Sequence, residues 1–424
     1  MCEQSSRKRF ITCADVVALW ATMSPAMLFV HDSSSSIKLV AVAYPLAAVY
    51  AVIRLCSAPL RTILCRTLQQ DKLYWICAAF FVVCTVASVV NSNAPLVTMR
   101  HTCLLCGTIV IGLYFGCRYS ITALMNVLLL ALLSVSLASI FLCLINPDIA
   151  IMHSPPFHHL HQDRWRGVFT HKNWLGLYMG LLATVAIAHV LVQNIKPMNF
   201  IAITLALMAS LFLLLKAQST TALISLSLSV AVILCGLVCH RNQKAIRWRN
   251  RSLLLILPLL SACILDNSMS VNLSTPTDVE KPGFSRDSSL SGRVSHWVHV
   301  TEAITNKPWR GHGYETFWHT EDANIIHSKN QWIAHKAHSG WLDVMLDLGL
   351  AVGTMIILWM AWGLWRVAAL AKRNMYFIAP TALTVYMFSS NSTESLLPNH
   401  SGLLFVLLIA LYVITSRHKS ESFI

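Results

Sequence analysis

Basic side chains stand close together just before a long apolar run that begins near residue 174. The segment reads Arg164-Trp-Arg166-Gly-Val-Phe-Thr-His171-Lys172-Asn173-Trp-Leu-Gly176. Thr170 suits the N-cap of the helix that follows, because its hydroxyl can accept from free amides of the first turn. Arg166, His171 and Lys172 would then lie at a helix N-terminus, where the positive end of the dipole and the basic side chains attract anions. The alternative is an interfacial anchor, with the tryptophans and basic residues at headgroup depth.

A second polar segment carries an arginine and two histidines at helical spacing. Residues Gly292 to Thr305 predict a short amphipathic helix with Arg293 in its first turn. His335 and His338 lie at the start of a later apolar run, and on a helix this spacing of three would place them on one face. A helix N-terminus disfavours imidazolium, so His338 is expected to be neutral and able to accept a proton. The alternative is a surface histidine without a chemical role.

These polar segments interrupt a strongly apolar chain. Of its 424 residues, 56% are hydrophobic and 12% are charged, and the mean hydropathy is +0.60. Soluble proteins carry about a quarter charged residues, so this composition excludes a soluble single-core enzyme, a disordered chain and a disulfide-stapled secreted domain. The net charge of +14 would suggest nucleic acid in a soluble protein. Here basic loops that flank membrane helices account for it, and no nucleic acid partner is expected.

The cysteines do not form a disulfide framework. All 13 lie in or beside apolar runs or at the N-terminus, and none lies in the two longest polar loops. Cys103 and Cys106 form a CxxC inside an apolar run, and this setting favours buried packing over a redox or zinc site.

Apolar runs of membrane-crossing length predict an all-α polytopic membrane protein with about twelve transmembrane helices. They lie near residues 13–31, 37–55, 74–91, 101–117, 121–145, 174–193, 199–215, 220–240, 252–266, 339–365, 375–389 and 401–416. The first run follows a basic N-terminus, and we expect it to be a retained helix that also acts as the signal.

Lysine and arginine decide the predicted orientation. They gather in the even-numbered connections and at both termini, and the positive-inside rule places these segments in the cytoplasm. The polar loops 146–173 and 267–337 then both face outward. Twelve of the 18 histidines lie in or beside these two loops. A polar, histidine-rich outer surface on an apolar scaffold predicts chemistry on a molecule presented from the membrane.

Four motifs, in this order, resemble the O-antigen ligase and polymerase superfamily. They are Arg-Gly-x-Phe-x-His-Lys-Asn from Arg166, Ser-Gly-Arg-x-x-x-Trp from Ser291, the turn Pro308-Trp-Arg-Gly311-His-Gly313-Tyr314, and His338-Ser-x-x-Leu. The resemblance covers roughly residues 160–400, and the first motif is most similar to the exopolysaccharide polymerase branch. Together with the predicted spans and orientation, it divides the chain into N-terminal helices 1–5 over residues 1–145, a ligase/polymerase-like region over 146–416 with outer loops 146–173 and 267–337, and a cytoplasmic tail over 417–424.

The resemblance also implies a reaction. Members are inner-membrane proteins that take a glycan from an undecaprenyl-pyrophosphate carrier and join it to an acceptor hydroxyl, without a nucleotide sugar, metal or other cofactor. Arg166 and Arg293 would grip the pyrophosphate, and His338 would act as general base or orient the acceptor hydroxyl. Further donor or pyrophosphate contacts are assigned to His171, Lys172, Asn173, Lys216 and Tyr314. Weaker similarities are the Lys216–Thr221 segment and Glu394 in the last outer loop.

Polymerases and ligases of this superfamily differ in the acceptor hydroxyl. It belongs to another lipid-linked repeat unit in a polymerase, and to lipid A core or a protein in a ligase. The His-Lys-Asn sequence favours a polymerase, and Trp297 and Val352 depart from the ligase pattern. The preferred interpretation is a polymerase, with a ligase as the alternative and a chain-length regulator as a conceivable partner.

A metal enzyme is one rival hypothesis. His153, His158, His159 and His161 crowd one short stretch, and zinc could use three of them. No carboxylate–histidine pattern at helical spacing supports this hypothesis, and the stretch lies outside the four motifs.

A transporter or flippase is the second rival. Twelve helices with both termini inside suit a secondary carrier, but such carriers usually show an internal repeat and ionisable groups in mid-membrane. The two halves of this sequence show no repeat, and Arg100, His101 and His189 are too few to suggest a relay.

Overall fold

The computed structural model describes residues 11–23, 33–153, 163–192, 197–240, 293–330, 334–398 and 402–421. Over these residues the regular structure is helical, apart from one antiparallel pair in which Ile151 faces Trp165. The elements are α1 (Cys13–Met23), α2 (Ser33–Leu55), α3 (Ala58–Gln70), α4 (Lys72–Ala87), η2 (Ser88–Asn91), α5 (Pro95–Arg118), α6 (Ile121–Ile145), α7 (Pro147–Ala150), β1 (Ile151–Met152), β2 (Arg164–Trp165), α8 (Lys172–Val192), α9 (Pro197–Ala217), α10 (Thr220–Cys239), α13 (Arg293–Asn306), η4 (Phe317–His319), α14 (Asp322–Asn330), α15 (Gly340–Leu348), α16 (Leu350–Ala371), η5 (Met375–Phe377), α17 (Ile378–Asn391) and α18 (Leu403–Glu421). The predicted all-α fold class is confirmed.

Seven helices in the described ranges are long and apolar enough to cross a membrane, so the predicted multi-pass protein is confirmed. They are Lys72–Asn91, Pro95–Arg118, Ile121–Ile145, Lys172–Val192, Phe200–Ala217, Thr220–Cys239 and Leu350–Ala371. Val42–Leu55 and Ala58–Gln70 form a further pair bent by 91°, which makes eight if the pair is one span. Shorter apolar helices lie at Cys13–Met23 and Leu403–His418. The predicted run 252–266 lies outside the described residues, so the total of twelve spans stays a prediction.

The predicted single helix over residues 339–365 is wrong. The chain breaks at Gly349, whose φ is +84°, so that α15 and α16 are separate helices. The amide of Leu350 donates to the carbonyl oxygen of Pro308 at 2.7 Å. This bond to a distant turn replaces the bond that the amide would make inside a continuous helix. A left-handed φ is readily available to glycine. The apolar sequence continues across this break, because α15 has apolar residues on its buried face. Hydropathy alone therefore does not mark the break.

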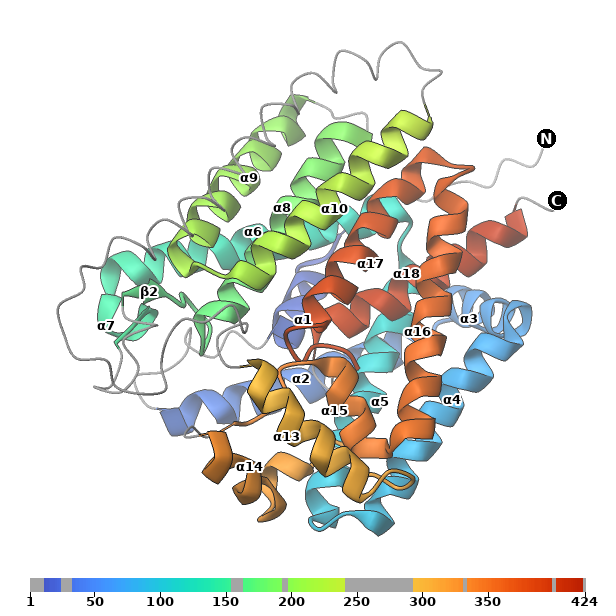
Figure 1. Ribbon diagram of the computed structural model, residues 1–424. Coiled ribbons are helices and arrows are strands. Elements are labelled where there is room, and N and C mark those ends of the chain that lie inside the picture. The colour runs from blue at the N-terminus through green and yellow to red at the C-terminus, as the bar shows by residue number, and fades with distance from the viewer. Residues whose placement is uncertain are drawn as a thin grey trace.

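Helix α8 is the centre of the larger helix group. In its most apolar stretch 94% of residues are buried inside the protein, against 50% or fewer for the other candidate spans. It packs against α6, α9, α10 and α17, and Figure 1 shows α8, α9 and α10 side by side with α17 beyond α10. The N-terminal end of α8 carries the first motif, so this enclosed helix gives that motif a fixed position.

Two glycines bring α5 and α18 into close contact. Gly112 and Gly116 lie four apart on α5, and a Cβ atom on either would come within 3 Å of Ile409 or Val413 on α18. Small residues at this spacing allow two membrane helices to approach along their backbones. The last helix is thereby fixed against the N-terminal half of the chain.

Helices α13, α14 and α15 lie together at one end of the molecule (Figure 1). They share a small hydrophobic core of their own, which includes Val300, Ile304, Phe317, Ile326 and Leu346. The predicted amphipathic helix from Gly292 to Thr305 is confirmed as α13, and its Val300 and Ile304 are buried as its pattern indicates. This helical group holds the second and fourth motifs beside the ends of α8, α10 and α17.

Candidate active site

Glu394 follows α17 in a loop that is folded back onto the helix end. Asn391, fully buried, accepts hydrogen bonds through Oδ1 from the amides of Leu396 at 2.9 Å and Leu397 at 2.7 Å. Its Nδ2 donates to the Leu397 carbonyl oxygen at 3.1 Å. The carbonyl oxygen of Glu394 also accepts from the amide of Gly340 at 3.2 Å. These bonds attach the loop to both α17 and α15, so Glu394 has a defined position.

Three motifs converge on the Glu394 carboxylate. Arg293 Nη2 lies 2.6 Å from Oε1, Asn173 Nδ2 donates to the same oxygen at 2.8 Å, and His338 Nδ1 lies 3.6 Å from Oε2. The side chains of Arg293 and Glu394 are 17% and 15% exposed, and that of His338 is 32% exposed. We call these four residues the Glu394 cluster. It joins residues from α8, α13, the segment before α15 and the loop after α17 in one partly open site.

The electrostatics of the cluster keep Glu394 ionised. Burial alone would raise the pKa of this carboxyl, but the polar contact with His338 and the charge of Arg293 hold the pKa below its ordinary value. The pKa of neighbouring His171 is also lowered, to about 4, because burial and the charge of Lys172 disfavour its protonated form. The lowered pKa leaves this histidine neutral, whereas it leaves Glu394 charged. At neutral pH an ionised Glu394 carboxylate and the Arg293 guanidinium therefore lie near the neutral imidazole of His171.

The sequence suggested Thr170 as the N-cap of α8, but the structure places His171 in that position. The helix begins at Lys172, and His171 Nδ1 accepts from the amide of Asn173 at 3.2 Å. The imidazole thus satisfies a free amide of the first turn, which is the role expected of the Thr170 hydroxyl. This bond also leaves the proton of neutral His171 on Nε2.

Lys172 and Thr221 connect the first motif to the segment between α9 and α10. Lys172, which is buried, donates from Nζ to the carbonyl oxygen of Gln218 at 3.2 Å. Thr221 Oγ1 accepts from Arg293 Nη1 at 3.4 Å and shares a 2.9 Å hydrogen bond with the Thr393 hydroxyl. The Lys216–Thr221 segment therefore supports the cluster through Gln218 and Thr221.

His335 and His338 do not share a helix face, contrary to the prediction. Both precede α15 in an irregular segment, and His338 has a φ of +52°. Helix α15 begins only at Gly340, where a Cβ atom would lie 2.1 Å from Asn391 Oδ1 and 2.5 Å from the Leu397 carbonyl oxygen. The backbone therefore turns sharply in front of the loop that carries Glu394, and this turn directs His338 toward the carboxylate while His335 is exposed.

Arg166 directly follows β2, and its side chain contacts the neighbouring α7 segment. Its Nε donates to the carbonyl oxygen of Ile149 at 2.8 Å, and burial lowers the pKa of its guanidinium. Gly167 follows with a φ of +57°, and a Cβ atom there would meet Ser139 at 2.6 Å. The Arg-Gly pair of the motif thus packs closely on α6. Among the described contacts Arg166 is not part of the Glu394 cluster.

Two other predicted site residues also lie apart from the cluster. The Lys216 ammonium lies 5.6 Å from the ring centre of Trp165 and 6.0 Å from that of Phe212, on an exposed face of α9. Tyr314 is buried, and its hydroxyl donates to the carbonyl oxygen of Pro398 at 3.4 Å. The observed contacts of both residues are structural.

The glycines of the third motif dock its turn onto the end of α15. Gly311 and Gly313 have φ values of +63° and +99°, and a Cβ atom on Gly311 would lie 2.2 Å from the carbonyl oxygen of Asp347. The amides of His312 and Gly313 donate to the carbonyl oxygens of Leu346 and Asp347, each at 3.0 Å. Backbone contact of this kind needs residues without side-chain bulk. The motif therefore positions α15, the helix that follows His338.

The structure describes only part of the region that the metal hypothesis concerns. His158, His159 and His161 lie outside the described residues, and His153 is exposed with Nε2 3.8 Å from Asp148. Within the described ranges no group of three or more His, Cys, Asp or Glu residues is arranged to hold a metal ion.

The two histidines weighed for a transporter have defined partners: His101 Nδ1 contacts the carbonyl oxygen of Glu315 at 3.2 Å, and His189 Nε2 contacts Asn126 at 2.8 Å.

Comparison with known proteins covers the region of the second, third and fourth motifs. Residues 203–358 match the family model described as O-Antigen ligase. A segment of 154 residues is 30% identical to the exopolysaccharide production protein ExoQ of Rhizobium meliloti (strain 1021), covering 36% of this chain and 34% of that protein. The chain therefore matches about a third of that relative's length. The predicted resemblance is confirmed over part of the chain: residues 203–358 of this multi-pass membrane protein are similar to the O-antigen ligase family.

Proposed function

We propose that this chain is a membrane glycosyltransferase that polymerises undecaprenyl-pyrophosphate-linked repeat units into a surface polysaccharide. The observation that carries the proposal is the Glu394 cluster, in which an arginine, a histidine and an asparagine from three family motifs meet on one carboxylate. A transporter would not need such an arrangement at the end of its helices. Transfer from a lipid pyrophosphate needs a cation for the leaving group and a base for the attacking hydroxyl.

In this mechanism Arg293 stabilises the departing pyrophosphate. A guanidinium has five N–H donors, and its bonds to Glu394 and Thr221 use two of them. Glu394 holds the guanidinium plane in place, so its remaining donors are oriented before the substrate arrives. Arg166 is assigned a second contact to the pyrophosphate, on the strength of the family motif alone.

His338 takes the proton of the acceptor hydroxyl. Its Nδ1 faces Glu394, so the carboxylate orients the ring and favours a tautomer in which Nε2 is the acceptor. The hydroxyl oxygen attacks the anomeric carbon of the donor glycan while the bond from that carbon to the pyrophosphate oxygen breaks. The pyrophosphate leaves with the electron pair, and the proton moves to Nε2. Each step is complete without a metal ion, nucleotide sugar or redox partner.

The family and the basic residues support a location for this reaction. We place the protein in the bacterial inner membrane with both termini in the cytoplasm and the Glu394 cluster on the periplasmic side. Lysine and arginine gather in the connections opposite to those that carry the four motifs. The carrier-linked glycan would reach the cluster from the outer leaflet.

A polymerase is favoured by the His171-Lys172-Asn173 sequence and by the similarity to an exopolysaccharide production protein. An O-antigen ligase is the second candidate, because the matching family model carries that description. The two enzymes share the donor and the leaving group, so substitutions in the Glu394 cluster do not separate them.

The products of a deletion strain separate the two functions. We expect single repeat units on the carrier and no long chains, with long chains restored by the wild-type gene. Analysis of the extracted carrier lipids by mass spectrometry would show this directly. Long chains that accumulate on the carrier, without reaching a final acceptor, would contradict the polymerase and identify a ligase. Wild-type polysaccharide in the deletion strain would contradict both.

A further inference from the structure

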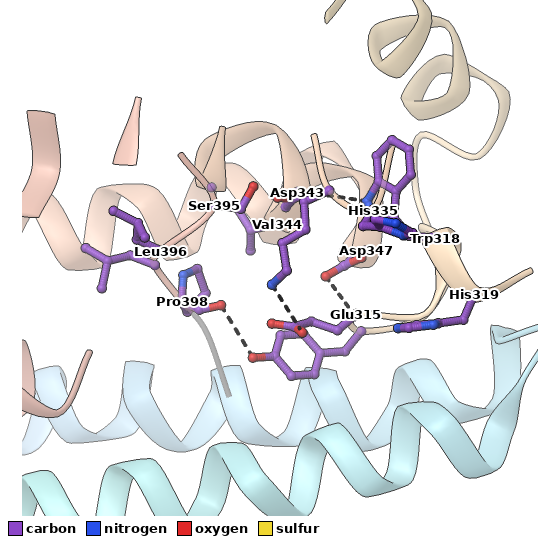
Figure 2. Close-up of a pocket in the computed structure, with 14 residues that line it drawn as sticks. Glu315, Trp318, His319, His335, Asp343, Val344, Asp347, Ser395, Leu396 and Pro398 are labelled. Carbon is purple, nitrogen blue, oxygen red and sulfur yellow. Dashed lines mark hydrogen bonds and ion pairs between the residues drawn. The ribbon is translucent and has the colours of Figure 1, made fainter. Parts of the chain in front are cut away.

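A partly open pocket is built from three chain segments, two of which are continuous with residues of the Glu394 cluster. Its walls come from Tyr314, Glu315, Trp318 and His319, from His335, Lys336, Gly340, Asp343, Val344 and Asp347, and from Ser395–Pro398. His338 lies within the second segment, and Glu394 directly precedes the third. Figure 2 shows Ser395, Leu396 and Pro398 on one side of the pocket and Trp318 and His319 on the other. The pocket and the cluster therefore share two stretches of chain.

The polar lining of the pocket differs from that of the Glu394 cluster. The ammonium of Lys336 lies 3.6 Å from Glu315 Oε2, and Asp347 Oδ2 accepts from the amide of Glu315 at 2.9 Å (Figure 2). Asp343 Oδ1 accepts from the amide of Ala337 at 3.0 Å and from the indole of Trp318 at 3.2 Å. Three carboxyl groups and one ammonium thus line the pocket, and the hydrogen bonds fix the orientation of each carboxyl group.

This lining does not suit the pyrophosphate. Burial raises the pKa of Asp343 and raises that of Asp347 well above its ordinary value. The positive charge of Lys336 is balanced by the Glu315 carboxylate. The two aspartates add either no charge or negative charge, so the net charge of these four groups is zero or negative. Such a pocket offers a pyrophosphate no net positive charge, whereas Arg293 in the cluster attracts it.

The same lining suits a sugar. Carboxyl groups accept hydrogen bonds from hydroxyls when ionised and donate when protonated, and Lys336 adds three donors. The indole of Trp318 adds an apolar aromatic surface of the kind that covers the C–H face of a pyranose ring. A few oriented polar groups in a concave site fix the orientation of a small molecule and provide its specificity.

We propose that this pocket, which we call the Glu315 pocket, binds the sugar residue that carries the acceptor hydroxyl. The proposal rests on the proposed function, since it presupposes a donor held at Arg293. The acceptor sugar would lie between the Glu315 carboxylate and the Trp318 indole, with one hydroxyl directed along the shared segment toward His338. The donor and acceptor would then occupy two sites of different charge, which prevents the carrier pyrophosphate from entering the acceptor site.

Two probes and the full-length protein in lipid nanodiscs test this inference. The first probe is the lipid-free repeat-unit oligosaccharide, released from the host strain's own polysaccharide, with binding followed by saturation-transfer NMR. The second probe is undecaprenyl pyrophosphate, with binding followed by tryptophan fluorescence. The variants are Glu315→Gln, which keeps the side-chain shape, and His319→Ala at an exposed position of the wall. Glu302→Gln on the exposed face of α13 is the matched control.

We expect Glu315→Gln to weaken oligosaccharide binding roughly tenfold, since a hydroxyl loses a bond to a charged acceptor. His319→Ala should weaken it severalfold, and Glu302→Gln should leave it unchanged. None of the three should change the affinity for undecaprenyl pyrophosphate. Wild-type oligosaccharide binding in both pocket variants would overturn the inference, and so would an equal loss of pyrophosphate binding. If Arg293→Ala binds undecaprenyl pyrophosphate as well as the wild type does, the proposed function fails while the oligosaccharide result still decides the pocket.

Discussion

Arg293 Nη2 and Glu394 Oε1 lie 2.6 Å apart, although 101 residues separate them in the chain. The arginine is the first residue of α13, and the glutamate lies in the loop after α17. Both side chains are mostly enclosed, so the pair is screened less by water than a surface ion pair would be. The ion pair therefore fixes the position of a family-motif arginine relative to the last outer loop, and it makes the function of Arg293 depend on Glu394.

Replacing Arg293 tests the leaving-group contact. We expect Arg293→Ala to lower the transfer rate by roughly 100- to 1,000-fold, the usual effect of removing one fixed donor to developing negative charge. Arg293→Lys should restore only part of the rate, because a point charge cannot reproduce the planar fork of a guanidinium. The measurement is glycan formation from a purified lipid-linked donor, normalised to inserted protein. Arg310→Ala in the same region is the control, and near-normal glycan from Arg293→Ala would contradict the assignment.

Replacing Glu394 tests whether the carboxylate organises the other groups. In Glu394→Gln the amide keeps one acceptor oxygen but loses the charge, so the rate should fall roughly tenfold to hundredfold. Glu394→Ala should cost more, because Arg293, Asn173 and His338 all lose their shared acceptor. A structural role alone would lower the amount of folded protein and leave the rate per folded molecule unchanged. Glu321→Gln, an exposed matched substitution, should behave as the wild type.

The sequence predicted that the motif residues belong to one site, and it gave Glu394 only as a weaker similarity. Arg293, Asn173 and His338 were expected together because their motifs occur in the order typical of one superfamily. Glu394 stands alone in a polar loop and has no local pattern, so only the contacts in space place it among the motif residues. The available signal was an acidic residue in a chain with few of them, in a short outer loop close to basic motifs. Asp343 and Asp347, four apart on α15, gave a similar signal that went unused.

Most membrane helices were predictable because hydropathy and length determine where a chain can cross a bilayer. The break at Gly349 was not, since it depends on the Pro308 carbonyl oxygen, which comes from a turn about 40 residues earlier. Arg166 and Lys216 were expected at the site from motif similarity, whereas their observed partners are Ile149 and the Trp165 ring. A motif identifies a residue type at a position, but the direction of its side chain depends on its neighbours in the fold.

Glycine at position 311 is predicted to be essential for the orientation of α15. Gly311→Ala would place a Cβ atom 2.2 Å from the Asp347 carbonyl oxygen at a φ of +63°, so the turn must move away from the helix. We expect a loss of about 2 kcal/mol or more in stability. Thermal unfolding followed by tryptophan fluorescence would measure it. Gly363→Ala on α16, where the nearest atom lies at 3.3 Å, should stay within about 1 kcal/mol of the wild type and serves as the matched control.

The buried histidine of α13 predicts a loss of stability in acid. Burial lowers the pKa of His296 to about 4, whereas an unfolded chain binds the proton near pH 6.5. Between these values the unfolded state carries more protons, so stability falls as the pH falls from about 6.5 toward 4. Going from pH 7 to pH 5, this one group should cost about 2 kcal/mol.

The comparison of His296→Gln with the wild type at both pH values isolates this effect. The variant should show a smaller drop in unfolding temperature between pH 7 and pH 5, whatever its stability at pH 7. His153→Gln, which changes an exposed histidine, should keep the full drop. An equal acid sensitivity of His296→Gln and the wild type would show that His296 titrates normally in the folded protein.

The last prediction separates His338 from the histidine-rich stretch near residue 153. If His338 accepts the proton of the attacking hydroxyl, His338→Ala should lower the rate by roughly 100- to 10,000-fold, the range for a general base. Joint alanine replacement of His153, His158, His159 and His161 should be tolerated, because none of the proposed proton or charge transfers uses them. For the same reason, a chelator added to purified protein with a lipid-linked donor should change the rate little. Inhibition by the chelator that zinc reverses, together with an inactive quadruple variant, would replace the His338 mechanism with a metal-dependent one.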